Sequence, residues 1–237
     1  MLIVKKIEKE LFDLASPVDA EFLQKYFKNG PGQYGEGDKF LGIRNPQTRL
    51  VAKKYYKLIT NDGIEVLLQS QWHEVRLCAL VIVTLIFPKA DDIQKKELFE
   101  MYLRSITNYI NNWDLVDLSA PNIVGNYLLN KDREVLFKLA QGDLWQKRVA
   151  ILTTFTFIKQ NDFVDSLTLA ETLLFEKHDL IHKALGWMLR EIGKKDVTVL
   201  NSFLDKYAAT MPRTTLRYAI EKLSKNEKHH YMSLKNA

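Results

Sequence analysis

Apolar residues recur every three to four positions along most of this chain, which is the spacing of a helix that buries one face. Residues 1 to 29 predict two helices separated near Ser16-Pro17, and no segment shows the alternation typical of a strand. We therefore expect an all-α protein. Further helices are predicted over residues 47–58, 63–69, 71–87, 92–107, 113–119, 122–129, 133–140, 144–160, 163–175, 179–193, 197–207 and 212–224.

Three of these helices share a basic-then-apolar pattern at a nearly constant interval. Arg148 in WQKRVAIL, Lys183 in LIHKALGW and Arg217 in TTLRYAIE are 35 and 34 residues apart. A period of this length, made of helix pairs, is typical of HEAT-type α-solenoids, whose stacked pairs present a curved face. The sequence therefore predicts one domain over residues 1–237, an α-solenoid of HEAT-like repeats with a concave basic face.

Two segments depart from this helical pattern. Five of the ten glycines fall within thirteen residues of GPGQYGEGDKFLGIRNP, so residues 30–45 should form a loop with unusual backbone angles, after which Asn45-Pro46 starts the next helix. The loop lacks the Gly-Lys-Ser/Thr of a Walker A motif, and Lys39 and Arg44 are its candidate phosphate contacts. Residues 1–45 are thus expected to form the N-terminal helices and the glycine-rich loop of the domain. Residues 225–237, with His229-His230, are expected to form a polar tail.

The positive charge of the chain is concentrated at one end. Residues 178–237 carry eight lysines and three arginines against six acidic residues, which accounts for the whole formal net charge of +5. Such asymmetry favours an anionic partner, most commonly nucleic acid, although a solvated basic end without a partner fits the charge equally well. The longest apolar run, Leu77 to Phe87, is too short to span a bilayer, and it contains the single cysteine, Cys78. We expect a cytoplasmic protein.

The segment around Trp113 pairs a large aromatic residue with a carboxylate. Asn112 is a good N-cap, and a helix that starts at Trp113 places Asp117 one turn away on the same face. Pro121 should end this helix near Ser119. The alternative is that Trp113 packs inward and Asp117 forms a cap or an ion pair at the surface.

A second tryptophan lies in a row of cations. In the helix predicted over residues 179–193, Ile181, Leu185, Met188 and Ile192 form an apolar stripe, whereas Lys183, Trp187, Arg190 and Lys194 follow the opposite side. A tryptophan among cations is well placed to lie against a sugar-phosphate backbone. Packing against a neighbouring repeat is the alternative.

In this order and at these separations, KFLGIRNPQTR, NNWDLVD, DLWQKRVAIL and IHKALGWMLREIGK resemble the AlkD-type DNA alkylation repair enzymes, which are alkylpurine DNA glycosylases built from HEAT-like repeats. The resemblance runs from about Tyr26 to Ser224. It implies that Asp117 is the catalytic aspartate, that Trp113 and Trp187 face the DNA, and that Arg148 contacts the DNA backbone. A family tyrosine falls on Tyr26. Where the family pattern has two successive tryptophans, this chain has Asn112-Trp113.

The resemblance thus implies an enzyme that excises cationic N3- or N7-alkylated purines from duplex DNA in base excision repair. Asp117 would stabilise the oxocarbenium-like sugar and activate water, with Trp113 and Trp187 completing the catalytic set. No cofactor or metal is expected, the protein should be a monomer, and it should associate with the nucleoid when bound to DNA. The expected DNA contacts are Arg148, Lys183, Arg190, Lys194, Arg213, Arg217, Tyr26, Lys39 and Arg44.

Two other functions fit parts of the sequence. A non-catalytic HEAT-like DNA-binding scaffold would need the basic face but not Asp117. A zinc hydrolase would use His178 and His182, which have the spacing of a zincin helix with Asp in place of the usual Glu. Asp is one methylene too short for that role, and His178 should precede the helix start.

Overall fold

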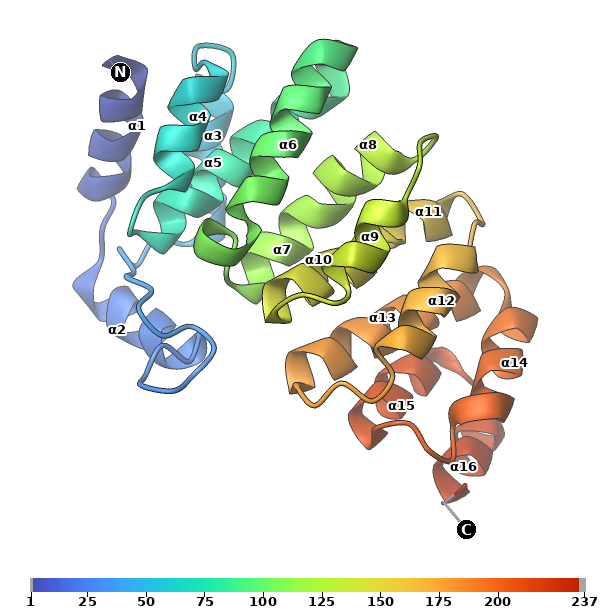
Figure 1. Ribbon diagram of the computed structural model, residues 1–237. Helices are drawn as coiled ribbons and strands as arrows, with labels where there is room; N and C mark the ends of the chain where they lie inside the picture. Colours follow the sequence, from blue (N-terminus) through green and yellow to red (C-terminus); the bar gives the residue numbers. More distant parts are fainter. Residues whose placement is uncertain (1, 235–237) are drawn as a thin grey trace. The chain divides into compact units, whose positions relative to one another are not determined.

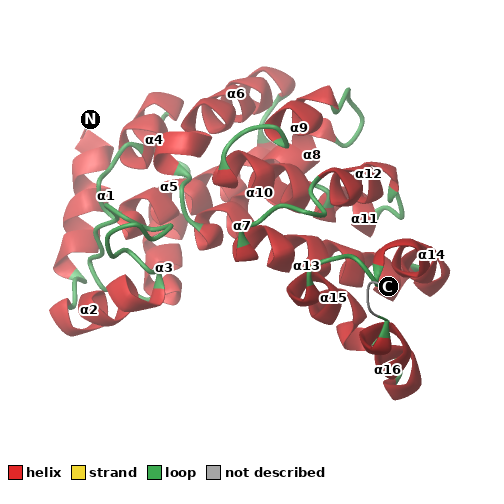
Figure 2. Cartoon of the chain, turned by 60° about the horizontal axis from the view of Figure 1, so that its bottom comes forward, coloured by secondary structure: helices red, strands yellow, loops and turns green. Residues whose placement is uncertain are grey.

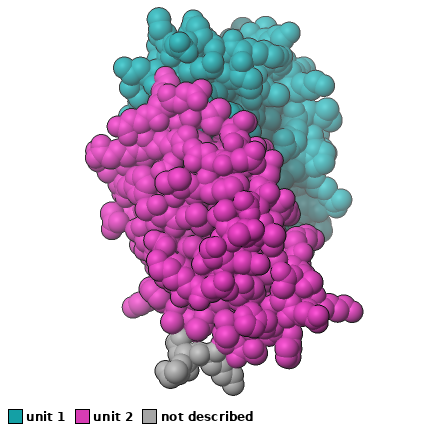
Figure 3. All heavy atoms as spheres, turned by 90° about the vertical axis from the view of Figure 1, so that its right-hand side faces the viewer, with its two compact units in different colours: residues 1–127 teal, residues 128–237 magenta. Residues whose placement is uncertain are grey.

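The computed structural model describes residues 2–234, and within that range every regular element is helical, as predicted (Figures 1 and 2). Pairing of β type within the described range is limited to one isolated parallel bridge between Lys39 and Trp72. The chain forms two compact units, residues 1–127 and 128–237 (Figure 3). None of the described helices is both long and apolar enough to cross a membrane.

The first unit is built around α5 (His73–Ile86), whose central residues are buried on all sides. This helix packs against α3 and α4 and also against α7, so it is the common support of the unit. The other helices are α1 (Leu2–Asp13), α2 (Pro17–Tyr26), α3 (Asn45–Tyr55), α4 (Asn61–Leu68), η1 (Phe87–Lys89), α6 (Asp92–Tyr109), α7 (Trp113–Ala120) and η2 (Pro121–Gly125), and α8 (Asn126–Leu128) contains the division between the units.

The second unit is organised around α13 (Asp179–Lys195), which packs against α10, α11, α14 and α15. Its apolar stripe of Ile181, Leu185, Met188 and Ile192 is fully buried, as the sequence predicts. The remaining elements are α9 (Glu134–Leu139), α10 (Leu144–Thr153), α11 (Phe155–Lys159), α12 (Val164–Thr172), α14 (Val197–Tyr207), α15 (Arg213–Ala219), η3 (Ile220–Lys222) and α16 (Lys225–Ser233).

Most of the expected polar tail over 225–237 forms a helix, α16. Ser224 accepts a hydrogen bond from the backbone N–H of Glu227, whose carboxylate accepts one from the Ser224 N–H, so this helix starts with a capping box. Tyr231 anchors it, because its ring is buried and its hydroxyl donates to Asp205 at 2.9 Å. Because Tyr231 is the buried residue of α16, the helix lacks a repeating apolar stripe. Residues 235–237 of the expected tail lie outside the described residues.

Pro121 ends the α-helical part of α7 close to Ser119, as expected for this proline. The α-helical part of α7 ends at Ala120, and a π-helical turn follows over Pro121–Gly125. Pro121 has no N–H to donate to the carbonyl group four residues earlier, and a wider turn accommodates that loss. The side-chain amide of Asn122 donates to the carbonyl oxygen of Leu118 at 2.7 Å, which helps to satisfy the backbone there.

Candidate functional site

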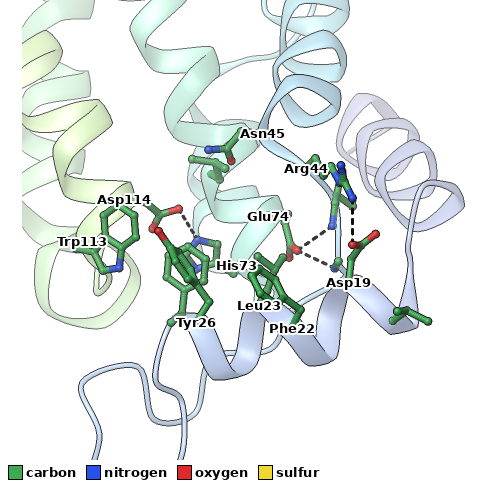
Figure 4. Close-up of a pocket in the computed structure, with 15 residues that line it drawn as sticks. Asp19, Phe22, Leu23, Tyr26, Arg44, Asn45, His73, Glu74, Trp113 and Asp114 are labelled. Carbon is green, nitrogen blue, oxygen red and sulfur yellow. Dashed lines mark hydrogen bonds and ion pairs between the residues drawn. The ribbon is translucent and has the colours of Figure 1, made fainter.

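The first unit contains a cavity of about 680 Å³ beside the start of α7 (Figure 4). Its volume lies in the range of small-molecule sites. Three expected site residues, Tyr26, Arg44 and Trp113, line it together. The other lining residues are Val18, Asp19, Phe22, Leu23, Phe27, Gly42, Ile43, Asn45, His73, Glu74, Leu77 and Asp114.

Trp113 is half-buried in an aromatic cluster at one side of this cavity. Its ring stacks on Phe27, with centroids 5.3 Å apart, and meets the edge of Tyr26 at 6.0 Å. Phe27 in turn stacks on Phe40 at 5.2 Å, and both phenylalanines lie within 5 Å of the His73 ring. The aromatic contacts fix the orientation of the indole.

The first turn of α7 is held by two side chains. Asn112 caps the helix as predicted, since its side-chain oxygen accepts a hydrogen bond from the Trp113 N–H at 2.8 Å. Asp114 follows, and its Oδ2 lies 2.9 Å from Nε2 of His73, the first residue of α5. Trp113 therefore sits between a helix cap and a buried carboxylate–imidazole contact, which limits its freedom to move.

His73 belongs to a buried network that reaches the glycine-rich loop. Its Nδ1 lies 3.2 Å from Oδ2 of Asp38, while the Arg76 guanidinium donates to Oδ1 of Asp38 at 2.5 Å. Asn112 also donates to Asp38, at 3.0 Å, so the cap residue of α7 is itself held by this carboxylate. Asp38, His73 and Arg76 are each at least 93% buried, and their charges compensate one another away from water.

This network favours the charged imidazolium. Burial of His73 opposes protonation, but the negative charge and hydrogen bond of Asp114, together with those of Asp38, outweigh it and raise the pKa of His73 to about 9. Burial also opposes ionisation of Asp38, and His73 and Arg76 overcome this and lower its pKa. At neutral pH the two carboxylates thus enclose a cation.

The glycine-rich loop is fixed by a second buried carboxylate. Glu74 accepts hydrogen bonds from the backbone N–H groups of Leu41, Gly42 and Ile43 at 2.9, 2.8 and 3.2 Å. Gly42 has a φ of +83°, and a Cβ there would lie 2.0 Å from the carbonyl oxygen of Ser16. Glycine is therefore required for the loop to reach the start of α2, and the loop acts as the back wall of the cavity.

Asp117 lies one turn beyond Trp113 on α7, as expected, and outside the residues that line the cavity. It is half-buried, next to the fully buried Tyr102. Burial raises the pKa of the Tyr102 hydroxyl, and the nearby negative charge of Asp117 raises it further. Tyr102 and Ser119 share a hydrogen bond of 2.8 Å that ties α7 to α6.

In the second unit, α13 places Lys183, Trp187, Arg190 and Lys194 at partly exposed positions, opposite the buried stripe. The cations of this row are paired with carboxylates. Lys194 donates to Glu191 at 2.6 Å and the Trp187 indole N–H donates to the same carboxylate at 3.1 Å. Lys183 pairs with Asp179 at 2.7 Å and Arg190 with Glu221. The row is thus less positive than its sequence suggested.

Two arginines expected to contact DNA have structural roles in the second unit. Arg148 is 4% exposed, and its guanidinium donates to the carbonyl oxygen of Leu180, which ties α10 to α13. Arg213 donates to the carbonyl oxygens of Met232 and Leu234 at 2.6 and 3.3 Å, where α16 ends. In the structure each guanidinium is thus engaged by carbonyl groups, and a contact of either residue with DNA stays a prediction.

The other expected DNA contacts lie at the surface. Arg217 is exposed on α15. Lys39 is exposed and donates to Gln71 at 2.9 Å, whereas Arg44 approaches Asp19 at 3.6 Å at the rim of the cavity. Arg44 is also the N-cap residue of α3, one position before Asn45, the cap that the sequence indicates.

The two histidines of the zincin-like spacing bond to the backbone. His178 caps α13, accepting a hydrogen bond from the Leu180 N–H, and Nε2 of His182 lies 2.5 Å from the carbonyl oxygen of Glu176. Over residues 2–234, no group of three or more histidine, cysteine, aspartate or glutamate side chains is arranged to hold a metal ion. These contacts give each histidine a structural role.

Sequence reasoning missed the network of Asp38, His73 and Arg76. Asp38 lies 35 residues before its histidine partner, and Asp114 lies 41 residues after it, so no local spacing connects them. The one signal in the sequence was Asp114 itself, an acid in the first turn of a capped helix. That signal suggests a favourable interaction with the helix dipole rather than a buried partner.

Comparison with known proteins identifies the family of this chain. Residues 7–223 match the family described as DNA alkylation repair enzyme. The chain belongs to this family. A solved structure, described as a predicted DNA alkylation repair enzyme from Enterococcus faecalis, superposes with a TM-score of 0.70 at 16% identity, covering 89% of this chain and 97% of that one. At this identity the likeness establishes the fold alone. A comparison with curated proteins finds no match.

Proposed function

We infer that this member of the DNA alkylation repair family is a glycosylase that removes cationic N3- or N7-alkylated purines from duplex DNA. The observation that carries the proposal is the geometry of α7, where Trp113 and Asp117 lie one turn apart on a helix whose start is fixed by Asn112 and Asp114. This reaction needs a carboxylate and an aromatic face, held in fixed positions, to stabilise the positive charge that develops on the sugar. The protein would work as a monomer in the cytoplasm, without a cofactor or metal.

The chemistry requires little from an acid catalyst. A purine alkylated at N3 or N7 already carries a positive charge, so it can leave as a neutral base while positive charge develops on the deoxyribose. A carboxylate next to that sugar stabilises the developing charge and orients or deprotonates the attacking water. Aromatic faces attract the same charge and exclude bulk solvent.

The two carboxylates of the Trp-Asp-Leu-Val-Asp sequence have different surroundings. Both oxygens of Asp114 are used, since Oδ2 contacts His73 and Oδ1 accepts the Leu115 N–H at 2.9 Å. Asp117 lies in the second turn, half-buried, and is the residue that we assign to the reaction. Asp114 positions the helix. In the second unit, Trp187 and the cations of α13 are proposed to face DNA.

The test is single-turnover release of N7-methylguanine from a duplex by Asp117→Asn. The amide keeps the shape and removes the charge, so we expect the rate to fall by about 10² or more, with duplex affinity and fold retained. Asp132→Asn, at an exposed position, is a matched control and should excise at the wild-type rate. Undiminished excision by Asp117→Asn would exclude the proposed role, and absence of excision by the wild type would favour the scaffold alternative.

A further inference from the structure

Two hollows of the first unit adjoin and form one groove. The first, of about 290 Å³, lies between the ends of α3 and α5, and the second, of about 390 Å³, lies between the starts of α4 and α6. Ile59 and Gln94 line both hollows, and the groove extends from Lys89 at one end to Asp62 at the other. Because α3 and α5 both begin at the aromatic cavity, the groove lies at their opposite ends, about 16 Å away along α3.

One end of the groove is positively charged. Lys89 donates to the Tyr56 hydroxyl at 3.2 Å, and the ammonium groups of Lys57 and Lys89 lie 5.8 and 5.2 Å from the centroid of the same ring. Within residues 2–234 neither ammonium forms an ion pair with a carboxylate. The Tyr56 hydroxyl accepts from Lys89 and keeps its own O–H to donate. This end therefore offers three hydrogen-bond donors to an anion.

The other end is negatively charged. It is lined by Asp62, Asp91 and Glu97, and among the described residues none of these carboxylates has a cationic partner. Asp91 accepts the Gln94 N–H as the cap of α6, and Glu97 accepts a hydrogen bond from the side-chain amide of Asn61, each at 2.8 Å. The acidic side chains are thus held by neutral donors, which leaves their negative charge available to a cation.

The groove also offers apolar surface to a ligand. Ile59 lines both hollows, and Ile93, in the wall of the negative hollow, is 73% exposed. Charges of opposite sign that line one groove without pairing with each other favour a ligand that carries both signs. A nucleic acid is disfavoured, because its phosphates would meet the carboxylates. A polypeptide segment provides both charges and an apolar side chain on one chain.

We propose that this groove binds a segment of a partner protein in which an acidic, an apolar and a basic residue follow one another. The carboxylate of the segment lies between Lys57 and Lys89, and its apolar side chain lies on Ile59. Its cation lies at Asp62 and Glu97. The charges at the two ends fix the direction of the segment. This interaction goes beyond the proposed glycosylase activity and does not depend on it, because the groove is remote from α7.

The experiment titrates the isotope-labelled full chain with acetylated, amidated peptides. In these peptides a glutamate and a lysine are separated by one to four residues, one of them leucine. The backbone amide signals of Ile59 and Gln94 report binding. We expect at least one spacing to bind with a dissociation constant of about a millimolar or below, and replacement of its glutamate or lysine by glutamine to weaken binding about threefold or more.

Variants of the groove test each charge separately. Lys57→Gln and Lys89→Gln should each weaken binding of the glutamate peptide by about two- to fivefold and leave binding of its glutamine counterpart unchanged. Asp62→Asn should act in the same way through the lysine of the peptide. Lys53→Gln is the matched control, because Lys53 is exposed on α3 four residues before Lys57 and does not line the groove.

Three outcomes would overturn the inference: no peptide that shifts the groove signals, an equal loss in Lys53→Gln, or equal losses for the glutamate and glutamine peptides. Weaker binding of undamaged duplex by Lys57→Gln and Lys89→Gln would assign these lysines to DNA instead. Self-association of the chain that Asp62→Asn abolishes would assign the groove to a second copy, and it also overturns the inference. Excision of N7-methylguanine should be unchanged in every variant, so this inference and the proposed function fail independently.

Discussion

The two tryptophans assigned to DNA lie on helices that are held in opposite ways. Trp113 begins α7, whose first turn is tied to α5 and the glycine-rich loop by the buried residues Asp38 and His73. Trp187 lies in the middle of α13, where the neighbouring ion pairs are at the surface or partly exposed. The first helix is positioned by charges that are almost fully buried. The second carries charges that solvent screens.

This difference suggests that the two helices have different roles. A catalytic carboxylate must be held in one position, and a buried network without freedom to rearrange provides this. A DNA-facing surface needs cations that can exchange a carboxylate for a phosphate, and surface pairs cost little to break. The first unit is thus suited to hold the reacting groups, and α13 of the second unit to bind the backbone.

The largest expected effect concerns Asp38. Asp38→Asn leaves His73 and Arg76 charged and buried with one counter-charge fewer, so the free energy of unfolding should fall by about 3 to 5 kcal/mol. The same change at Asp179, which pairs with Lys183 on the surface of α13, should cost less than about 1 kcal/mol. Urea unfolding of both variants measures the contrast. Similar losses would show that the two helices are not held differently.

The sequence predicts those features of the two helices that depend on residues close together in the chain. Helical periodicity located most elements, because each is amphipathic over several turns, and it separated the buried stripe of α13 from Trp187 correctly. It also placed Asn112 as the cap of α7. These features depend on residues within one or two turns of each other, which is the range over which spacing carries information.

The features that sequence did not supply depend on distant partners. The contacts of His73 cross from α5 to the loop and to α7, and Glu74 binds backbone groups more than thirty residues away. Arg148 was expected to contact DNA because the family resemblance implies it, and Arg213 because it lies in the basic C-terminal part of the chain. Only the fold shows that carbonyl groups of α13 and α16 receive their hydrogen bonds.

The next effect is a dependence of stability on pH through His73. Its folded pKa of about 9 lies above the ordinary 6.5, so the folded state holds a proton that the unfolded state loses first. The stabilisation is complete below pH 6.5 and is lost as pH rises through about 9, for a total of about 3 kcal/mol. Urea unfolding across this range should show the decline, and His73→Gln should be less stable at low pH and lack the decline. Parallel curves for the two proteins would contradict a charged His73.

The smallest expected effect is a change in DNA affinity when a carboxylate on α13 is neutralised. This prediction rests on the proposed contact between α13 and DNA. Glu191 pairs with Lys194 and accepts the Trp187 N–H, so Glu191→Gln removes a negative charge from the cationic row. Affinity for undamaged duplex should rise by about two- to fivefold at low salt, because one unit of repulsion for phosphate is lost, and the gain should shrink as salt increases. Unfolding free energy should change by less than about 1 kcal/mol, because the amide can still accept the indole hydrogen bond.

Glu134→Gln is the control, because it removes one negative charge from an ion pair with Lys138 on α9. If both variants bind duplex with wild-type affinity, the α13 row does not face DNA, and the role given to Trp187 is lost with it.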